Sequence, residues 1–361
     1  MARIVAAMSG GVDSSVAAAL LARDAADSGD EVIGVWMRLH PDNGEGYEQS
    51  RSCCSPDAAD DARRVAQIVG IPFFALNLER EFEAKVIDAF ADGYLDGATP
   101  NPCQACNQYI KFDVLLRRGL AAYGAERVAT GHYARVEQRD GAHALLRAAD
   151  AEKDQTYFLW VLDQDQLAAT SFPLGELMKP EVRRIAAELD LPTAAKPESQ
   201  EICFVPAGDY RELLAERRGY VGEPGPIVDA DGTRLGTHTG YAHYTVGQRH
   251  GLGVALGEAV YVREVLPASN TVVVGRRDEV AARHFTAEGR RFVAGEPPAD
   301  RFDASVRIRH RSPDVACEVT LVGEERFVVE TDEPVWAPAP GQAAVLYDGE
   351  VCLGGGRIAR A

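Results

Sequence analysis

Short apolar segments alternate with amphipathic ones over the first half of the chain. Apolar runs at residues 4–7, 31–39, 73–78 and 127–130 are typical of buried strands, and the stretches 16–22, 56–70 and 81–94 have the character of helices. A further helix is expected from Cys106 or Asn107 to Tyr123, because Pro100 and Pro102 argue against an earlier start. This alternation predicts a doubly wound α/β fold with a parallel sheet.

The pattern changes after Pro206. One helix over residues 208–218 precedes glycine-rich sequence, and residues 261–266 and 271–275 form an alternating pair. Short β-like runs follow at 302–308, 316–321, 326–331, 342–347 and 350–359. Such regular spacing, with Pro and Gly turns, predicts a small closed or nearly closed β-barrel. We therefore expect a catalytic domain over 1–205, a β-rich central domain over 206–282 and a C-terminal β-barrel over 283–361.

Composition narrows the function classes. The 361 residues carry a net charge of −17, which argues against indiscriminate binding to nucleic acid but leaves room for a local basic surface. The apolar runs are too short to span a bilayer, and the seven cysteines follow no paired secretory framework. We expect a cytoplasmic protein with no membrane partner, whose thiols are reduced or act as ligands.

A glycine-containing loop joins the first strand to the first helix. It has the sequence Met8-Ser9-Gly10-Gly11-Val12-Asp13-Ser14-Ser15, in which two glycines permit a sharp turn and the hydroxyls add donors. The positive end of the following helix favours an anion, so the arrangement predicts a phosphate site. Asp13 is expected to face a divalent cation or an orienting serine. No Gly-Lys-Ser/Thr closes the loop, which excludes the Walker pattern.

This loop resembles the Ser-Gly-Gly-x-Asp-Ser loop (PP-loop) of the ATP pyrophosphatases, which cleave ATP between the α and β phosphates to activate an oxygen. Three cysteines then become informative, namely Cys103, Cys106 and Cys203, each in a proline-rich or polar stretch. No second Cys-x-x-Cys or His-x-x-x-His is present to complete a zinc site. An adenylated oxygen awaits a nucleophile, and a thiolate is the nucleophile that these residues offer.

Six blocks resemble the bacterial tRNA-specific 2-thiouridylases and occur in that family's order. They are residues 8–15, 99–107, 129–133, 153–155, 199–204 and 245–253. The resemblance implies ATP- and Mg²⁺-dependent transfer of sulfur to C2 of the wobble uridine in tRNAs for Lys, Glu and Gln. The tRNA anticodon stem-loop would be one partner, and a cysteine desulfurase or sulfur-relay protein the other.

The resemblance also implies roles for individual residues. ATP would be contacted by Ala7, Met8, Ser9, Gly10, Gly11, Val12, Asp13, Ser14, Met37 and Gly131. The target base would be framed by Asn101, Pro102 and Cys103, with His132 beside it. Contacts to tRNA would come from Lys153, Asp154, Gln155, Arg309, His310 and Gln342. Independently, a cluster of arginines at 301, 307, 309 and 311 would give one face of a strand a charge that suits RNA.

Two sulfur mechanisms remain open at this level. In the first, a persulfide on Cys203 supplies the sulfur and Cys106 closes a Cys106–Cys203 disulfide as the product leaves. In the second, Cys103, Cys106 and Cys203 hold three corners of a [4Fe–4S] cluster whose fourth iron binds sulfide. The cluster mechanism is considered because Cys103 stands where many family members carry Asp. The acid–base role of that Asp cannot be carried over to a cysteine.

Two other functions compete with thiolation. A PP-loop synthetase or amidotransferase would use a nitrogen nucleophile, and a non-catalytic RNA-binding module would retain only the nucleotide-binding fold. Neither needs the cysteine set. The remaining thiols, Cys53, Cys54, Cys317 and Cys352, are expected to be packing or surface groups.

Overall fold

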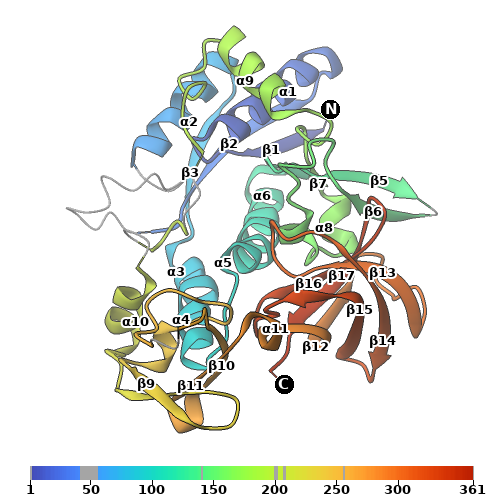
Figure 1. Cartoon of the computed structure of the whole chain (residues 1–361). Coiled ribbons are helices and arrows are strands. Elements are labelled where there is room, and N and C mark those ends of the chain that lie inside the picture. The colour runs from blue at the N-terminus through green and yellow to red at the C-terminus, as the bar shows by residue number, and fades with distance from the viewer. Residues whose placement is uncertain are drawn as a thin grey trace.

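A computed structural model describes residues 2–40, 56–139, 141–198, 202–205, 209–254 and 257–360. Figure 1 shows a helix-covered sheet, a small β-rich part and a barrel arranged around one another. Cys53, Cys54 and residues 199–201 lie outside the described residues, so the expectations for them stay predictions. Within the described ranges, no helix combines the length and apolarity needed to cross a membrane.

The first sheet is parallel, with strand order β3-β2-β1-β4-β7. Its strands are β1 (Arg3–Ala7), β2 (Glu31–Arg38), β3 (Phe73–Asn77), β4 (Arg127–Ala129) and β7 (Thr170–Ser171). Alternate residues of β1 enter different cores. Ala6 packs with α1 (Val12–Ser28), α2 (Pro56–Val69) and α9 (Lys179–Glu188), whereas Val5 and Ala7 pack with α6 (Leu116–Tyr123). Helices therefore cover both faces, which confirms the predicted α/β class.

Two long helical stretches lie below the sheet in Figure 1. The first consists of α3 (Glu79–Phe82), a π-helical segment η1 (Glu83–Ile87) and α4 (Asp88–Leu95). The second consists of α5 (Pro102–Ala105), a π-helical segment η2 (Cys106–Leu115) and α6. The expected start at Cys106 or Asn107 is wrong, because proline is tolerated at the first helical position and Asn101 caps the helix. Short helices α7 (Thr156–Leu159) and α8 (Gln164–Ala168) follow.

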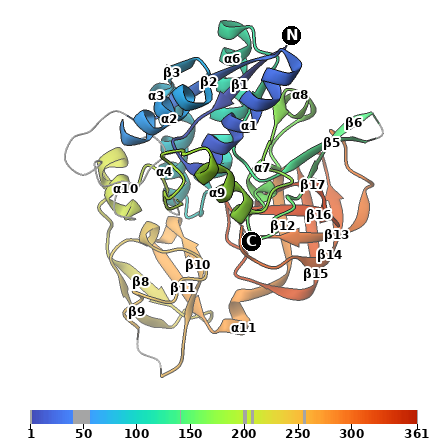
Figure 2. The ribbon, with the colours of Figure 1, turned by 90° about the horizontal axis from the view of Figure 1, so that it is seen from above.

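The central part begins with α10 (Tyr210–Arg218) and contains a sheet of order β10-β11-β8-β9. The strands are β8 (Gly225–Val228), β9 (Arg234–His238), β10 (Tyr261–Leu266) and β11 (Thr271–Gly275), with 3₁₀ turns η4 (Tyr241–His243) and η5 (Pro267–Ser269). The antiparallel pairing of β10 and β11 confirms the predicted alternating pair. Figure 2 shows this part beside the barrel, with α11 (Arg277–Val280) leading from one to the other.

The C-terminal barrel closes through pairing of its first and last strands. Its members are β12 (Ala281–Phe292), β13 (Arg301–Arg307), β14 (Val315–Val322), β15 (Arg326–Trp336), β16 (Ala343–Asp348) and β17 (Val351–Ile358), and β12 pairs with both β15 and β17. The predicted barrel is confirmed. Sequence reasoning missed that the hairpin β5 (Arg135–Arg139)–β6 (Ala142–Leu146), from the N-terminal half, extends the same sheet next to β17.

The predicted arginine face does not form. Strand β13 ends at Arg307, so Arg309 and Arg311 do not share a strand face with it. Arg307 pairs with Asp314 and Asp154, and Arg309 donates to the Ala337 carbonyl at 2.8 Å. Two of these guanidinium groups are therefore committed to the protein interior instead of to an exposed strand.

Candidate active site

The loop between β1 and α1 turns at Gly10, whose φ of +69° lies in the left-handed region. A Cβ at Gly10 would come within 2.2 Å of the Ala58 carbonyl oxygen on α2. Ser14 fastens the loop, since its hydroxyl accepts from the Ser9 N–H at 3.0 Å and donates to the Gly11 carbonyl at 3.1 Å. The cradle expected from the sequence is thus built, with the start of α1 facing it.

Gly131 lies against the start of α1. A Cβ at this position would meet the Ser14 nitrogen at 2.6 Å and the Asp13 carbonyl carbon at 2.7 Å. The backbone after β4 therefore lies in such close contact with the loop that a side chain at position 131 would not fit. Met37, near the end of the neighbouring strand β2, packs partly buried at the boundary between two apolar clusters. Both residues lie where the sequence predicted a nucleotide, at the carboxyl ends of parallel strands.

Asp13 has partners other than those expected. Its carboxylate accepts a hydrogen bond from the Tyr133 hydroxyl at 2.8 Å and from the Lys179 ammonium at 2.7 and 2.8 Å. Lys179 also contacts Glu198 at 2.6 Å, and Glu198 in turn pairs with Lys153 at 2.9 Å. The lysine and the tyrosine were not foreseen from the sequence, and the expected divalent cation or orienting serine stays a prediction.

We call this chain of charges the Asp13–Lys179–Glu198–Lys153 network. Its charges influence the pKa values of Glu198 and of the neighbouring Tyr133. Burial would raise the pKa of Glu198, but hydrogen bonds from Lys153 and Lys179 outweigh it and lower that pKa to about 2. Burial, with the charge of Asp13, raises the pKa of Tyr133. Glu198 is therefore ionised, and Tyr133 is a neutral donor, at neutral pH.

Sequence reasoning missed Lys179, Lys196 and Glu198 as site residues. The ammonium of Lys196 donates to the Gly10 carbonyl at 2.9 Å and to Asp61 at 2.8 Å. A usable signal was present, because the chain has only five lysines among 38 basic residues. Lys179 and Lys196 contact the loop, and Lys153 is linked to it through Glu198, so three of the five lysines supply compact charges there.

The Asn-Pro-Cys block is held from two sides. Asn101 caps α5 by accepting from the Cys103 N–H at 3.1 Å, and Pro102 occupies the first helical position. The Gln104 amide donates to the Tyr157 carbonyl at 3.1 Å, and the Asn107 amide to the Phe158 carbonyl at 3.0 Å. Cys103 and Cys106 are therefore carried on a helix start that is fixed to α7.

The barrel completes this support. The Gln342 amide donates to the Thr99 carbonyl at 2.7 Å, and the Tyr157 hydroxyl donates to the Ile308 carbonyl at 3.0 Å. The ring of His310 lies over Phe158 with centroids 4.6 Å apart. Gln342 and His310, both predicted to touch tRNA, thus lie next to the segment that carries the cysteines. That placement is compatible with contacts to tRNA, which stay a prediction.

Cys106 and Cys203 belong to the surroundings of one apolar cluster. Both side chains are partly buried against the group that contains Phe82, Phe90 and Phe204. Phe204 is fully buried, with its ring 5.2 Å from Phe90 and 5.8 Å from Phe82, and it anchors the short described segment 202–205. Residues far apart in the sequence thus bring both thiols to the same apolar cluster.

No three His, Cys, Asp or Glu side chains of the described residues converge on a point that could hold a metal ion. Cys103 is exposed, whereas Cys106 and Cys203 are half-buried. The cluster and the persulfide route therefore both stay predictions.

Three predicted site residues have mainly internal contacts. The Asp154 carboxylate is 1% exposed, accepts from the Thr156 hydroxyl at 2.8 Å and pairs with Arg147 and Arg307. It therefore anchors the 153–155 turn, and its contact with tRNA stays a prediction. His132 is buried, with Thr130 Oγ1 2.7 Å from its Nδ1, and burial together with Lys111 lowers its pKa well below the ordinary value. Gln155 accepts from the Tyr133 N–H at 2.9 Å.

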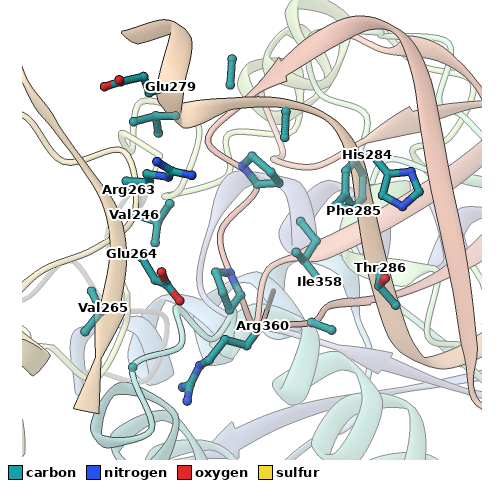
Figure 3. A pocket seen from close by; sticks show the side chains of 17 residues that line it. Val246, Arg263, Glu264, Val265, Glu279, His284, Phe285, Thr286, Ile358 and Arg360 are labelled. Atoms are coloured by element: carbon teal, nitrogen blue, oxygen red, sulfur yellow. The ribbon is translucent and has the colours of Figure 1, made fainter. Parts of the chain in front are cut away.

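A separate cavity of about 390 Å³ lies between the central part and the barrel. Figure 3 shows Arg263 and Glu264 on one side of it and His284 and Phe285 on the other. None of the residues lining it belongs to the predicted site. This cavity is therefore distinct from the loop and the cysteine segment.

Comparison with known proteins agrees with this geometry. Family models match residues 2–207 (tRNA methyl transferase HUP domain), 212–276 (tRNA methyl transferase PRC-barrel domain) and 282–358 (aminomethyltransferase beta-barrel domain). The tRNA-specific 2-thiouridylase MnmA of Carboxydothermus hydrogenoformans is 48% identical over 359 residues, covering 99% of this chain and 97% of that protein. The MnmA of Chloroflexus aggregans is 47% identical over 361 residues, covering 100% and 99%.

Among solved structures, the U34-tRNA thiolase NcsA from Methanococcus maripaludis, with its [4Fe-4S] cluster, is similar with a TM-score of 0.36 and 16% identity. It covers 60% of this chain and 65% of that one, a likeness too slight to bear on the site. The relatives, in contrast, match over nearly their whole length. The chain belongs to the tRNA-specific 2-thiouridylase family.

Proposed function

We propose that this protein replaces O2 of a tRNA wobble uridine by sulfur, in an ATP-dependent reaction. The uracil O2 attacks the α-phosphorus of ATP, the bond to the bridging oxygen breaks, and pyrophosphate leaves with the electron pair. The adenylated C2 then carries AMP as its leaving group. The tRNAs for Lys, Glu and Gln are the proposed substrates, and magnesium enters as MgATP, bound by the phosphates and water.

The sulfur step uses the two partly buried thiols. The terminal sulfur of a Cys203 persulfide attacks C2 and displaces AMP. The Cys106 thiolate attacks the inner sulfur of that persulfide, which breaks the S–S bond and forms a Cys106–Cys203 disulfide. The transferred sulfur is reduced to the thiocarbonyl level while the two cysteines are oxidised, so a thiol reductant must restore them. A cysteine desulfurase or sulfur-relay protein is the proposed source of the persulfide sulfur.

One observation carries the proposal. Cys106 and Cys203, far apart in the sequence, pack against the same apolar cluster as Met37, which lies at the end of the strand next to β1. The descriptions of the family models mention methyl transfer, but that reaction calls for neither a PP-loop nor a thiol pair. A synthetase with a nitrogen nucleophile likewise has no use for the pair.

The test is mass spectrometry of nucleosides from unmodified tRNA incubated with the protein, ATP, magnesium and a persulfide donor. We expect 2-thiouridine with the natural chain and none with Cys106→Ser or Cys203→Ser, whereas Cys352→Ser, a buried thiol in the barrel, keeps the activity. Full turnover by Cys106→Ser would favour the synthetase reading. Lack of tRNA-dependent exchange between ATP and pyrophosphate would favour a non-catalytic RNA-binding module.

A further inference from the structure

Lys179 is a charged side chain that is firmly held beside the PP-loop. Its ammonium lies 2.7 and 2.8 Å from the two Asp13 oxygens and 2.6 Å from Glu198, and its side chain is only 10% exposed. A buried ammonium without partners would lose much of its solvation energy, so the two carboxylates stabilise it in this position. Asp13 lies in the first turn of α1, which brings this charge to the helix end that faces the loop.

The backbone of Lys179 is fixed as firmly as its side chain. Lys179 is the first residue of α9, and its N–H donates to the buried Asp150 carboxylate at 2.8 Å. Helix α9 packs through Val182 and Ala186 into the core that also contains the inner face of α1. The ammonium is therefore positioned by packing as well as by charge, which is how groups that act on a transition state are usually held.

Lys196 contacts the same loop in a different way. Its ammonium bonds to the Gly10 carbonyl, and in a trans peptide the following N–H points the opposite way. Lys196 thereby turns the Gly11 N–H away from itself and toward the other side of the loop. Its contacts explain the shape of the cradle, whereas those of Lys179 place a charge beside it.

The proposed reaction needs a cation at this position. Release of pyrophosphate puts negative charge on the β- and γ-phosphates, and the loop itself offers neutral donors together with the negative Asp13. An ammonium has three N–H donors, so one can turn from a carboxylate oxygen to a phosphate oxygen while Asp13 still balances the charge. Among the described neighbours of Asp13, Lys179 is the cation in direct contact with it.

We propose that Lys179 binds the β- and γ-phosphates of ATP and neutralises pyrophosphate as it leaves, with Asp13 and Glu198 as the residues that position it. This inference rests on the proposed adenylation and adds a residue to it. AMP lacks both phosphates, so it does not use Lys179. Pyrophosphate binding and AMP binding therefore separate the role of Lys179 from the general integrity of the loop.

The experiment measures binding of inorganic pyrophosphate and of AMP to the whole chain by calorimetry. In Lys179→Gln, we expect pyrophosphate affinity to fall about ten- to a hundredfold, as for a hydrogen bond to a charged group, and AMP affinity to change less than about twofold. Lys85→Gln is the matched control, because Lys85 pairs with Asp113 away from the loop and should change neither. Lys179→Arg keeps the charge and should recover part of the pyrophosphate affinity.

Pyrophosphate affinity unchanged in a folded Lys179→Gln would overturn the inference, and so would equal losses for pyrophosphate and AMP. If the variant does not fold, acetylation of the natural chain decides. Pyrophosphate should slow modification of Lys179 while AMP does not, and equal rates with the two would again refute it. None of these measurements needs tRNA or sulfur, so failure to thiolate would count against the proposed function alone.

Discussion

Replacing Gly10 by alanine tests whether close approach shapes the PP-loop. Gly29 is a matched control, because its φ of +78° resembles the +69° of Gly10 while a Cβ there would meet nothing within 4 Å. Alanine in the left-handed region costs about 1–2 kcal/mol at either position. The difference between the two variants therefore isolates contacts from backbone strain.

At Gly10 the new methyl group would lie 2.2 Å from the Ala58 carbonyl oxygen, where ordinary contact is 3.4–4 Å. That oxygen belongs to the backbone of α2, so the loop and the helix must move apart. Forced overpacking of this kind costs about 1–3 kcal/mol. Movement of the loop also strains the bond from Lys196 to the Gly10 carbonyl. We expect Gly10→Ala to lose about 2–5 kcal/mol of unfolding free energy, and Gly29→Ala about 1–2 kcal/mol.

The assay is urea unfolding followed by circular dichroism, together with ATP affinity by calorimetry. Gly10→Ala should bind ATP more weakly, because the displaced loop no longer presents its N–H groups correctly, whereas Gly29→Ala should bind it normally. Equal destabilisation of the two variants, with ATP affinity unchanged in both, would refute the assignment of the loop as a backbone cradle.

Three further predictions follow from burial and charge. Asp154→Asn should destabilise the chain by about 3–5 kcal/mol in urea, because it removes one partner of a buried ion pair. Glu198→Gln should remove a stabilisation that exists above pH 4.5, the ordinary pKa of glutamate, and that fades as pH falls toward the lowered pKa of about 2; urea titrations across that range measure it. Iodoacetamide at neutral pH should label the exposed Cys103 before Cys317 and Cys352, since burial raises the pKa of both latter thiols to about 12.

Each of these has an outcome that contradicts it. An Asp154→Asn chain as stable as the natural one would mean that Thr156 and the arginines find other partners. The difference in unfolding free energy between the natural chain and Glu198→Gln could also stay constant from neutral pH down to pH 2. That result would show that the stabilisation by Glu198 does not depend on its charge. Early labelling of Cys352 in the folded protein would show that the barrel opens readily. Peptide mass spectrometry identifies the thiol concerned.

Much of the fold follows from local rules. Apolar runs identified β1, β2, β3 and β4, and regular alternation with turn residues identified the barrel. The loop between Met8 and Ser15 was recognisable from the sequence because its glycines and its hydroxyl side chains are close neighbours along the chain. The start of α5 was missed because one proline has opposite meanings, as a helix breaker inside a helix and as a favourable first residue.

The sequence alone therefore determined what depends on neighbours along the chain, namely the period of each element and the glycine-containing turn after β1. What only the tertiary structure decided is which distant charges meet. Asp13, Lys179, Glu198 and Lys153 form one chain of contacts, Asp154 is buried between two arginines, and the β5–β6 hairpin joins the barrel. The reason is physical, since Coulomb and hydrogen-bond energies depend on distance in space and on local dielectric, neither of which sequence separation specifies.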